Sequence, residues 1–179
     1  RKSGREDSKI DWEEVFRLTH MVREEIGENF HWRTIHQWGC EADDVIATLC
    51  QQTQEFGNYE PVMIISADHD FKQLQVYENV KQYSPLQKKF VVATPSATEY
   101  RLEHIIKGCS GDGVPNVLSD DDTFIDESKR QTPMSKKKLK MLMDNPRSLG
   151  ETVYRNYIRN EKLVSLTDKK HDLPESVRS

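Results

Sequence analysis

The sequence has little of what builds disulfide-rich, zinc-binding or membrane-spanning proteins. Only three cysteines occur among 179 residues, and none forms a Cys-x-x-Cys pair. Such an odd, scattered set indicates a reducing, cytoplasmic location, and His31, His36, Cys40 and Cys50 lack the spacing of a zinc site. No apolar run approaches the roughly 18 residues that cross a bilayer, and the basic N-terminal stretch has no apolar signal segment. We therefore expect neither a disulfide scaffold nor a membrane partner.

Charge is distributed unevenly along the chain. The net charge is −4, but residues 1–128 carry 13 basic and 24 acidic side chains, whereas residues 129–179 carry 13 basic and 6 acidic ones. An acidic metal site beside a phosphate-binding surface would produce this asymmetry. A lysine-rich, solvated surface would produce it too.

The apolar pattern predicts an α/β protein with a parallel sheet flanked by helices. Asp11 and Glu14 form a capping-box pattern before a first helix that should end at Gly27. The continuously apolar run 61–66 predicts a buried parallel strand. We also expect strands at 32–38, 80–83 and 88–93, and helices at 42–56, 71–76, 96–107, 136–143 and 152–160.

Two segments should lack regular structure. Residues 108–116 hold three glycines and a proline, which predicts a tight loop. Residues 119–133 are acidic and polar, which predicts an exposed, mobile excursion. The helices after this excursion should pack on or beside the sheet.

Acidic residues gather where apolar runs begin or end. Carboxylates that converge from separate segments repel one another unless cations hold them together, and oxygen-only clusters suit Mg²⁺ and Mn²⁺. The pattern therefore indicates a metal-dependent enzyme that acts on phosphates. The residues concerned are Glu41, Asp43 and Asp44, then Asp68 and Asp70, then Asp112.

The positions of these residues support a common site. Asp68 and Asp70 follow the apolar strand and, two residues apart, can point the same way. Ligands of open α/β sheets bind beyond the carboxyl ends of the strands. For Asp43 and Asp44, helix capping is the simpler alternative.

Other phosphate or metal motifs do not fit the sequence. A calcium-binding loop from Asp68 would need glycine where Gln73 stands. An aspartyl-phosphate phosphatase would need threonine where Lys72 stands. The glycine loop at 108–113 is neither a Walker sequence nor a dinucleotide-binding fingerprint.

Three ordered segments, EADDVIATL, SADHDFKQL and KGCSGDGVPNVL, resemble the 5′-nuclease family. This family includes flap endonucleases, the 5′-nuclease domain of bacterial DNA polymerase I and the ribonuclease H of T-even phages. The segments DWEEVF and KQYSPLQKKFV are similar to the phage type. The resemblance covers nearly the whole chain.

The resemblance implies a PIN-like α/β core, a helix–three-turn–helix DNA-binding motif and a helical C-terminal part. The core would occupy residues 1–95, without the family's N-terminal strand and arch, and the helical region residues 96–179. Two Mg²⁺ or Mn²⁺ ions would support phosphodiester hydrolysis. The expected activity is removal of RNA primers and 5′ flaps in DNA replication, in the host cytoplasm if phage-encoded. A single-stranded-DNA-binding protein is an expected partner.

The resemblance also assigns roles to residues. The expected catalytic residues are Glu41, Asp43, Asp68 and Asp70, and the metal ligands are these four with Asp44 and Asp112. Branched or flapped duplex DNA, or an RNA–DNA hybrid, would be held by Gly111, Gly113, Val114 and Asn116, with K⁺ at this loop, and by Lys136, Lys137, Lys138 and Lys140. For the lysines, a solvated helix is the alternative.

Two departures from the family pattern keep a second function open. Cys109 stands where the family has an aspartate after glycine, and a thiol is a poor ligand for Mg²⁺. The family's first strand, with its metal-binding aspartate, and its basic arch should precede Arg1. The alternative is therefore a non-catalytic fragment that binds branched DNA through an incomplete metal site. A phosphatase of small monoesters is a third class.

Overall fold

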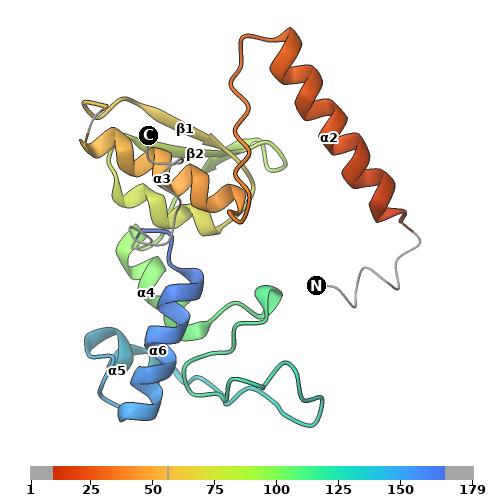
Figure 1. Cartoon of the computed structure of the whole chain (residues 1–179). Coiled ribbons are helices and arrows are strands. Elements are labelled where there is room, and N and C mark those ends of the chain that lie inside the picture. Colours follow the sequence, from red (N-terminus) through yellow and green to blue (C-terminus); the bar gives the residue numbers. More distant parts are fainter. Residues whose placement is uncertain (1–9, 56, 168–179) are drawn as a thin grey trace. The chain divides into compact units, whose positions relative to one another are not determined.

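The computed structural model describes residues 10–55 and 57–167 (Figure 1). The chain divides after Gly39 into two compact units. Phe56, the predicted end of the second helix, lies outside the described residues. Among the described helices, none has the length and apolarity needed to span a bilayer.

The first unit is built around one helix. Helix α2 (Trp12–Asn29) begins where predicted, because the Asp11 carboxylate accepts a hydrogen bond of 3.1 Å from the Glu14 N–H. It continues two residues past Gly27, the predicted end. The strand predicted at 32–38 is wrong, since these residues form no strand. Alternating side chains suit a strand, but only hydrogen bonds to a neighbouring strand create one.

The second unit contains a sheet of three strands in the order β1 (Val62–Ile65), β2 (Val80–Ser84) and β3 (Lys89–Val91). β1 and β2 are parallel, with Ile64 opposite Gln82. β3 is antiparallel to β2, so the prediction of a purely parallel sheet is wrong. The short turn between these two strands explains the difference, because parallel strands need a long crossover. The fold is a mixed α/β architecture.

One apolar core joins helix α3 (Ala42–Glu55) and the short helix η1 (Asp70–Val76) to the sheet. Buried Gln73 ties η1 to the end of the described chain, because its amide donates to the Val164 carbonyl and accepts from the Leu166 N–H. This core holds α3 and η1, the two helices that begin at the first two acidic segments. Its buried members are Ala47, Cys50, Ile64, Phe71, Leu74, Val80 and Leu166.

A second core joins helices α4 (Ala97–Lys107), α5 (Lys136–Asp144) and α6 (Glu151–Val164). Ser96 and Ser135 cap α4 and α5 through their hydroxyls. The loop between α4 and α5 includes the short helix η2, residues 110–112. The helix–three-turn–helix motif predicted for this region stays a prediction. The core's buried members are Ile105, Ile106, Val114, Val117, Leu142, Tyr157 and Val164.

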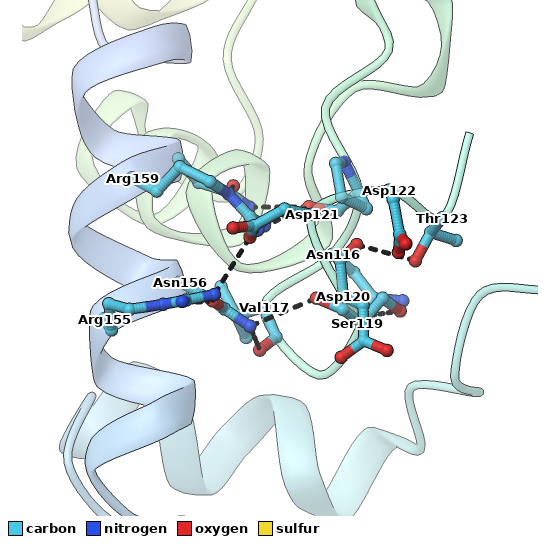
Figure 2. A network of polar contacts seen from close by, with 12 residues as sticks. Asn116, Val117, Ser119, Asp120, Asp121, Asp122, Thr123, Arg155, Asn156 and Arg159 are labelled. Atoms are coloured by element: carbon cyan, nitrogen blue, oxygen red, sulfur yellow. Dashed lines mark hydrogen bonds and ion pairs between the residues drawn. The ribbon is translucent and has the colours of Figure 1, made fainter. Parts of the chain in front are cut away.

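The excursion predicted at 119–133 is wrong in one respect, because part of it is buried against α6 (Figure 2). Ser119 and Thr123 are 3% and 5% exposed. Asp121 forms ion pairs with both Arg155 and Arg159 of α6. One acidic residue of this segment therefore serves as a counter-charge for two arginines of α6.

Asn156 should contribute strongly to stability. It is 3% exposed, and its Nδ2 donates to the carbonyls of Val117 and Ser119 at 3.0 and 3.1 Å (Figure 2). Asn156→Ala leaves both buried carbonyls without this donor, so we expect a loss of about 2 kcal/mol or more in urea unfolding. Lys107→Ala is the control, because the ion pair of this exposed lysine with Glu103 should contribute less than about 1 kcal/mol. Equal losses would refute the special role of Asn156.

Candidate metal centre

The turn after β1 places Asp68 and Asp70 at the carboxyl end of the sheet. The Ser66 hydroxyl accepts from the Asp68 N–H at 3.1 Å, and the Asp68 carboxylate accepts from the Asp70 N–H at 3.0 Å. Buried Gln82 on β2 donates to the carbonyls of Ser66 and Asp68. The turn is therefore held by side chains from two strands, and η1 starts directly from it.

Asp68, His69 and Asp70 form a compact group. One ligand atom from each lies within 4.8 Å of the others. The Asp70 side chain is 19% exposed, whereas those of Asp68 and His69 are 46% and 61% exposed. Burial raises the pKa of Asp70, against the opposing effects of His104 and His69, and the negative Asp68 raises it further. The surroundings of Asp70 therefore disfavour its ionised, negatively charged form.

The start of α3 contributes a second set of carboxylates. Burial raises the pKa of Asp43, and Asp68 raises it further, followed by Glu41 and Asp70. The carboxylates of α3 and of the β1–η1 turn therefore interact, although they are more than twenty residues apart in sequence. Asp44 has a local role as well, because its carboxylate accepts from the Glu41 N–H at 3.3 Å. Capping at Asp44 is consistent with the alternative that the sequence left open.

The loop after α4 brings a third segment to the group. Cys109 and Val114 exchange backbone hydrogen bonds of 2.9 Å, which fold the loop back on itself. The Cys109 Sγ donates to Asp112 Oδ2 at 2.9 Å. Burial and this hydrogen bond raise the pKa of the Cys109 thiol. Asp112 also raises the pKa of Asp70, so the loop belongs to the same electrostatic group.

Sequence reasoning missed two aromatic side chains in this group. His104 on α4 places its Nε2 at 3.2 Å from Asp70 Oδ1, and burial lowers the pKa of His104. Tyr100, one turn earlier, stacks on the His104 ring with centroids 5.9 Å apart. Burial and the nearby Asp70 raise the pKa of Tyr100 to about 12. The signal available in the sequence was the i, i+4 spacing of these rings on a helix that leads into the Asp112 loop.

The residues present fit a divalent cation. Their donors are mainly carboxylate oxygens, the set that Mg²⁺ and Mn²⁺ prefer. Within residues 10–55 and 57–167, Asp70 Oδ1 and His104 Nε2 are buried without a hydrogen-bond partner. Carboxylates with raised pKa values would gain from a positive charge between them. A cation here would reduce the repulsion between the carboxylates and would give both unsatisfied atoms a partner.

The residues predicted to hold nucleic acid differ in exposure. Gly111 and Gly113 are exposed, whereas Val114 and Asn116 are each 6% exposed. The Asn116 side chain accepts from the Leu118 N–H and the Ser119 hydroxyl, so it is occupied within the fold. Contacts from this loop would therefore involve its backbone. All four lysines of α5 that were predicted to contact phosphates are exposed: Lys136, Lys137, Lys138 and Lys140.

Similarity to known proteins agrees with this arrangement. Residues 2–103 match the family model of the 5′-3′ exonuclease N-terminal resolvase-like domain. Ribonuclease H of Enterobacteria phage T4 is 34% identical over 171 residues, which cover 92% of this chain and 55% of the phage protein. The chain thus spans about half the length of that relative.

Solved structures show the same fold. A T5 protein co-crystallised with metal ions aligns with a TM-score of 0.59 and 20% identity, over 93% of this chain and 67% of that one. A mutant T5 5′-exonuclease aligns with a TM-score of 0.55 and 21% identity, over 86% and 65% of the two chains. The mixed, resolvase-like α/β architecture is consistent with a PIN-like fold. The family-model match over residues 2–103, more than half of the chain, shows that the chain belongs to the 5′-3′ exonuclease family of 5′-nucleases.

Proposed function

We propose that this chain carries the metal centre of a 5′-nuclease that hydrolyses phosphodiester bonds at primers and flaps. The compact group of Asp68, His69 and Asp70 supports this proposal, together with the raised pKa values of Asp43 and Asp70, to which carboxylates from separate segments contribute. A structural role alone does not explain them, because burying like charges together costs stability. The proposed ligands are Glu41, Asp43, Asp68, Asp70 and Asp112, with Asp44 behind them.

The chemistry follows from what these residues can hold. Bound divalent ions supply Lewis acidity and a water of lowered pKa. The Asp68 and Asp70 carboxylates would be the central anchors, because the turn that carries them is fixed by Gln82 and Ser66. The exposed backbone at Gly111 and Gly113 would bind the phosphates of duplex DNA. The α5 lysines would add phosphate contacts further along.

The substrates proposed are RNA primers in RNA–DNA hybrids and 5′ flaps on branched duplex DNA. Phage T4 ribonuclease H is the relative that favours an RNA-containing substrate. A K⁺ ion at the Gly111–Gly113 loop and a single-stranded-DNA-binding partner remain parts of this proposal.

The alternative is a module that binds branched DNA without cleaving it. Cys109 favours this alternative, because its thiol donates to Asp112 at the place where the family carries a second carboxylate. A weaker second metal position would follow.

One assay separates these functions. The chain is incubated with a 5′-labelled flap duplex and an RNA–DNA hybrid in Mg²⁺, Mn²⁺ or EDTA, beside the Asp68→Asn variant. Cleavage that needs metal and is lost in the variant supports the nuclease. Shifted mobility without cleavage supports the binding module. If the chain neither cleaves nor shifts these substrates, both functions are refuted for this chain. Turnover of p-nitrophenyl phosphate without a DNA preference would indicate a phosphatase instead.

A further assay tests whether the centre is complete. The same substrates are given to the chain extended at its N-terminus to the length of its relatives. Cleavage only by the extended protein would show that ligands outside these 179 residues are required.

Cys109→Asp should strengthen divalent-ion binding. A carboxylate at this position would face Asp112 and act on Asp70, both of which already interact with Cys109. We expect the affinity for Mg²⁺ in calorimetric titration to rise roughly tenfold. The thermal midpoint without metal should fall, because one more like charge is added.

Ser110→Asp is the matched control for this substitution. It adds the same charge at the neighbouring, exposed position of the loop. An equal gain in both variants would indicate general electrostatic attraction, and no gain from Cys109→Asp would refute the prediction.

A further inference from the structure

The strongest unexplained feature outside the predicted ligand set is the buried imidazole of His104. Its side chain is 10% exposed, and its Nε2 lies 3.2 Å from Asp70 Oδ1. Both atoms are buried, and neither has a hydrogen-bond partner among the residues that the structure describes. The two atoms are within ion-pair distance, but they do not meet the geometry of a hydrogen bond.

This arrangement is costly unless a third group joins the two atoms. An unpaired buried polar atom costs roughly 1–3 kcal/mol, and natural structures contain few of them. Two ligands bound at about 2.1 Å to one cation, at about 90–100° to each other, would lie about 3.0–3.2 Å apart. The observed separation of 3.2 Å has this value.

The surrounding side chains hold the His104 ring in place. Tyr100 stacks on it at an interplanar angle of 11°, and the His69 ring meets it edge-on at 89°. Lys72 lies 5.0 Å from the centre of the Tyr100 ring. An imidazole restrained on two sides loses little further freedom when it binds a metal, which favours a ligand role.

We infer that His104 supplies a nitrogen ligand, through Nε2, to the divalent ion bound by Asp70. The inference rests on the proposed metal centre and adds a ligand that its carboxylates do not include. The exposed neighbour His69 is not this ligand, since its Nε2 is 3.7 Å from Asp70 Oδ1 and its side chain is 61% exposed.

A mixed nitrogen and oxygen set changes metal preference. Imidazole favours later first-row ions, whereas a carboxylate-only set suits Mg²⁺ and Mn²⁺. His104→Gln keeps a polar side chain but removes the imidazole. We expect it to weaken Co²⁺ binding roughly 10–100-fold in calorimetric titration, and Mg²⁺ and Mn²⁺ binding by less.

The decisive measurement does not depend on activity. Electron spin-echo spectroscopy of Mn²⁺ bound to the unmodified chain should show modulation from a coordinated ¹⁴N nucleus. This modulation should vanish in His104→Gln and persist in the matched control His69→Gln. Circular dichroism and thermal unfolding verify that each variant folds. If a variant does not fold, the spectrum of the unmodified chain still shows whether nitrogen is coordinated.

Each outcome decides between the possibilities. Mn²⁺ binding without nitrogen modulation overturns the inference but leaves the proposed carboxylate centre intact. Modulation that is lost in His69→Gln and kept in His104→Gln assigns the ligand to the other histidine and also overturns it. Failure of Mn²⁺ to bind at all overturns both the inference and the proposed function.

Discussion

Asp70→Asn is expected to abolish tight divalent-ion binding and, at the same time, to stabilise the metal-free chain. The substitution keeps the size of the side chain but removes a buried charge that its surroundings already disfavour. We expect the affinity for Mg²⁺ or Mn²⁺ to fall at least about tenfold. Without metal, the thermal midpoint should rise by about 2–4 °C, which corresponds to about 1 kcal/mol for a chain of this size.

The paired readout separates a functional carboxylate from a structural one. Calorimetric titration gives the affinity, and thermal unfolding with and without Mg²⁺ gives the stability, because a ligand of the folded state raises the midpoint. Asp144→Asn, which removes an exposed charge at the end of α5, is the control and should change neither. A lower midpoint in the metal-free Asp70→Asn variant would contradict the prediction, since the carboxylate would then stabilise the fold by itself.

Gly108→Ala is expected to be the most destabilising single substitution in the loop after α4. Gly108 has φ 67° and ψ −173°, a conformation that is essentially restricted to glycine. A Cβ there would lie 2.4 Å from the Val114 carbonyl oxygen and 2.6 Å from that of Pro115. Backbone strain and steric overlap together should cost about 3 kcal/mol or more in urea unfolding.

Gly113→Ala provides the matched comparison. Gly113 also has a positive φ, 74°, but no atom lies within 4 Å of a Cβ built on it. Only the strain of the left-handed conformation remains, which is about 1 kcal/mol. Losses of equal size would mean that the close approach at Gly108 does not matter. If Gly108→Ala retains its stability but loses metal affinity, the loop has moved instead of unfolding.

In the loop after α4, favourable packing and unfavourable charge repulsion occur together. Gly108 lets the loop fold against the Val114 and Pro115 carbonyls, and the Pro115 carbonyl also accepts from buried Asn160. The tightly packed loop brings Asp112 toward Asp70, where their charges repel. Packing in the two cores therefore stabilises an arrangement of carboxylates that is unfavourable on its own.

Local sequence patterns predicted the elements whose signals are local. The Asp11 and Ser96 caps mark helix starts because each side chain bonds to an N–H three residues later. The strand at 61–66 was recognisable because it is short, apolar and bounded by turn residues. The strand expected at 32–38 failed because strand formation depends on a partner that the pattern does not reveal.

The same distinction applies to the candidate site. The spacing of Asp68 and Asp70 predicted that they act together, and they lie in one compact group. The role of Asp121 was not predictable, since its partners Arg155 and Arg159 are more than thirty residues away. His104 was overlooked because its i, i+4 spacing from Tyr100 is also typical of an ordinary amphipathic helix.

The sequence alone determined that cysteines and long apolar runs are scarce. It also determined the three acidic segments and their similarity to 5′-nucleases. Tertiary structure decided which carboxylates interact and that the His104 side chain lies beside Asp70. The physical reason is range. Caps, turns and periodicity act over a few residues, whereas burial and charge repulsion depend on segments that only the packed cores bring together.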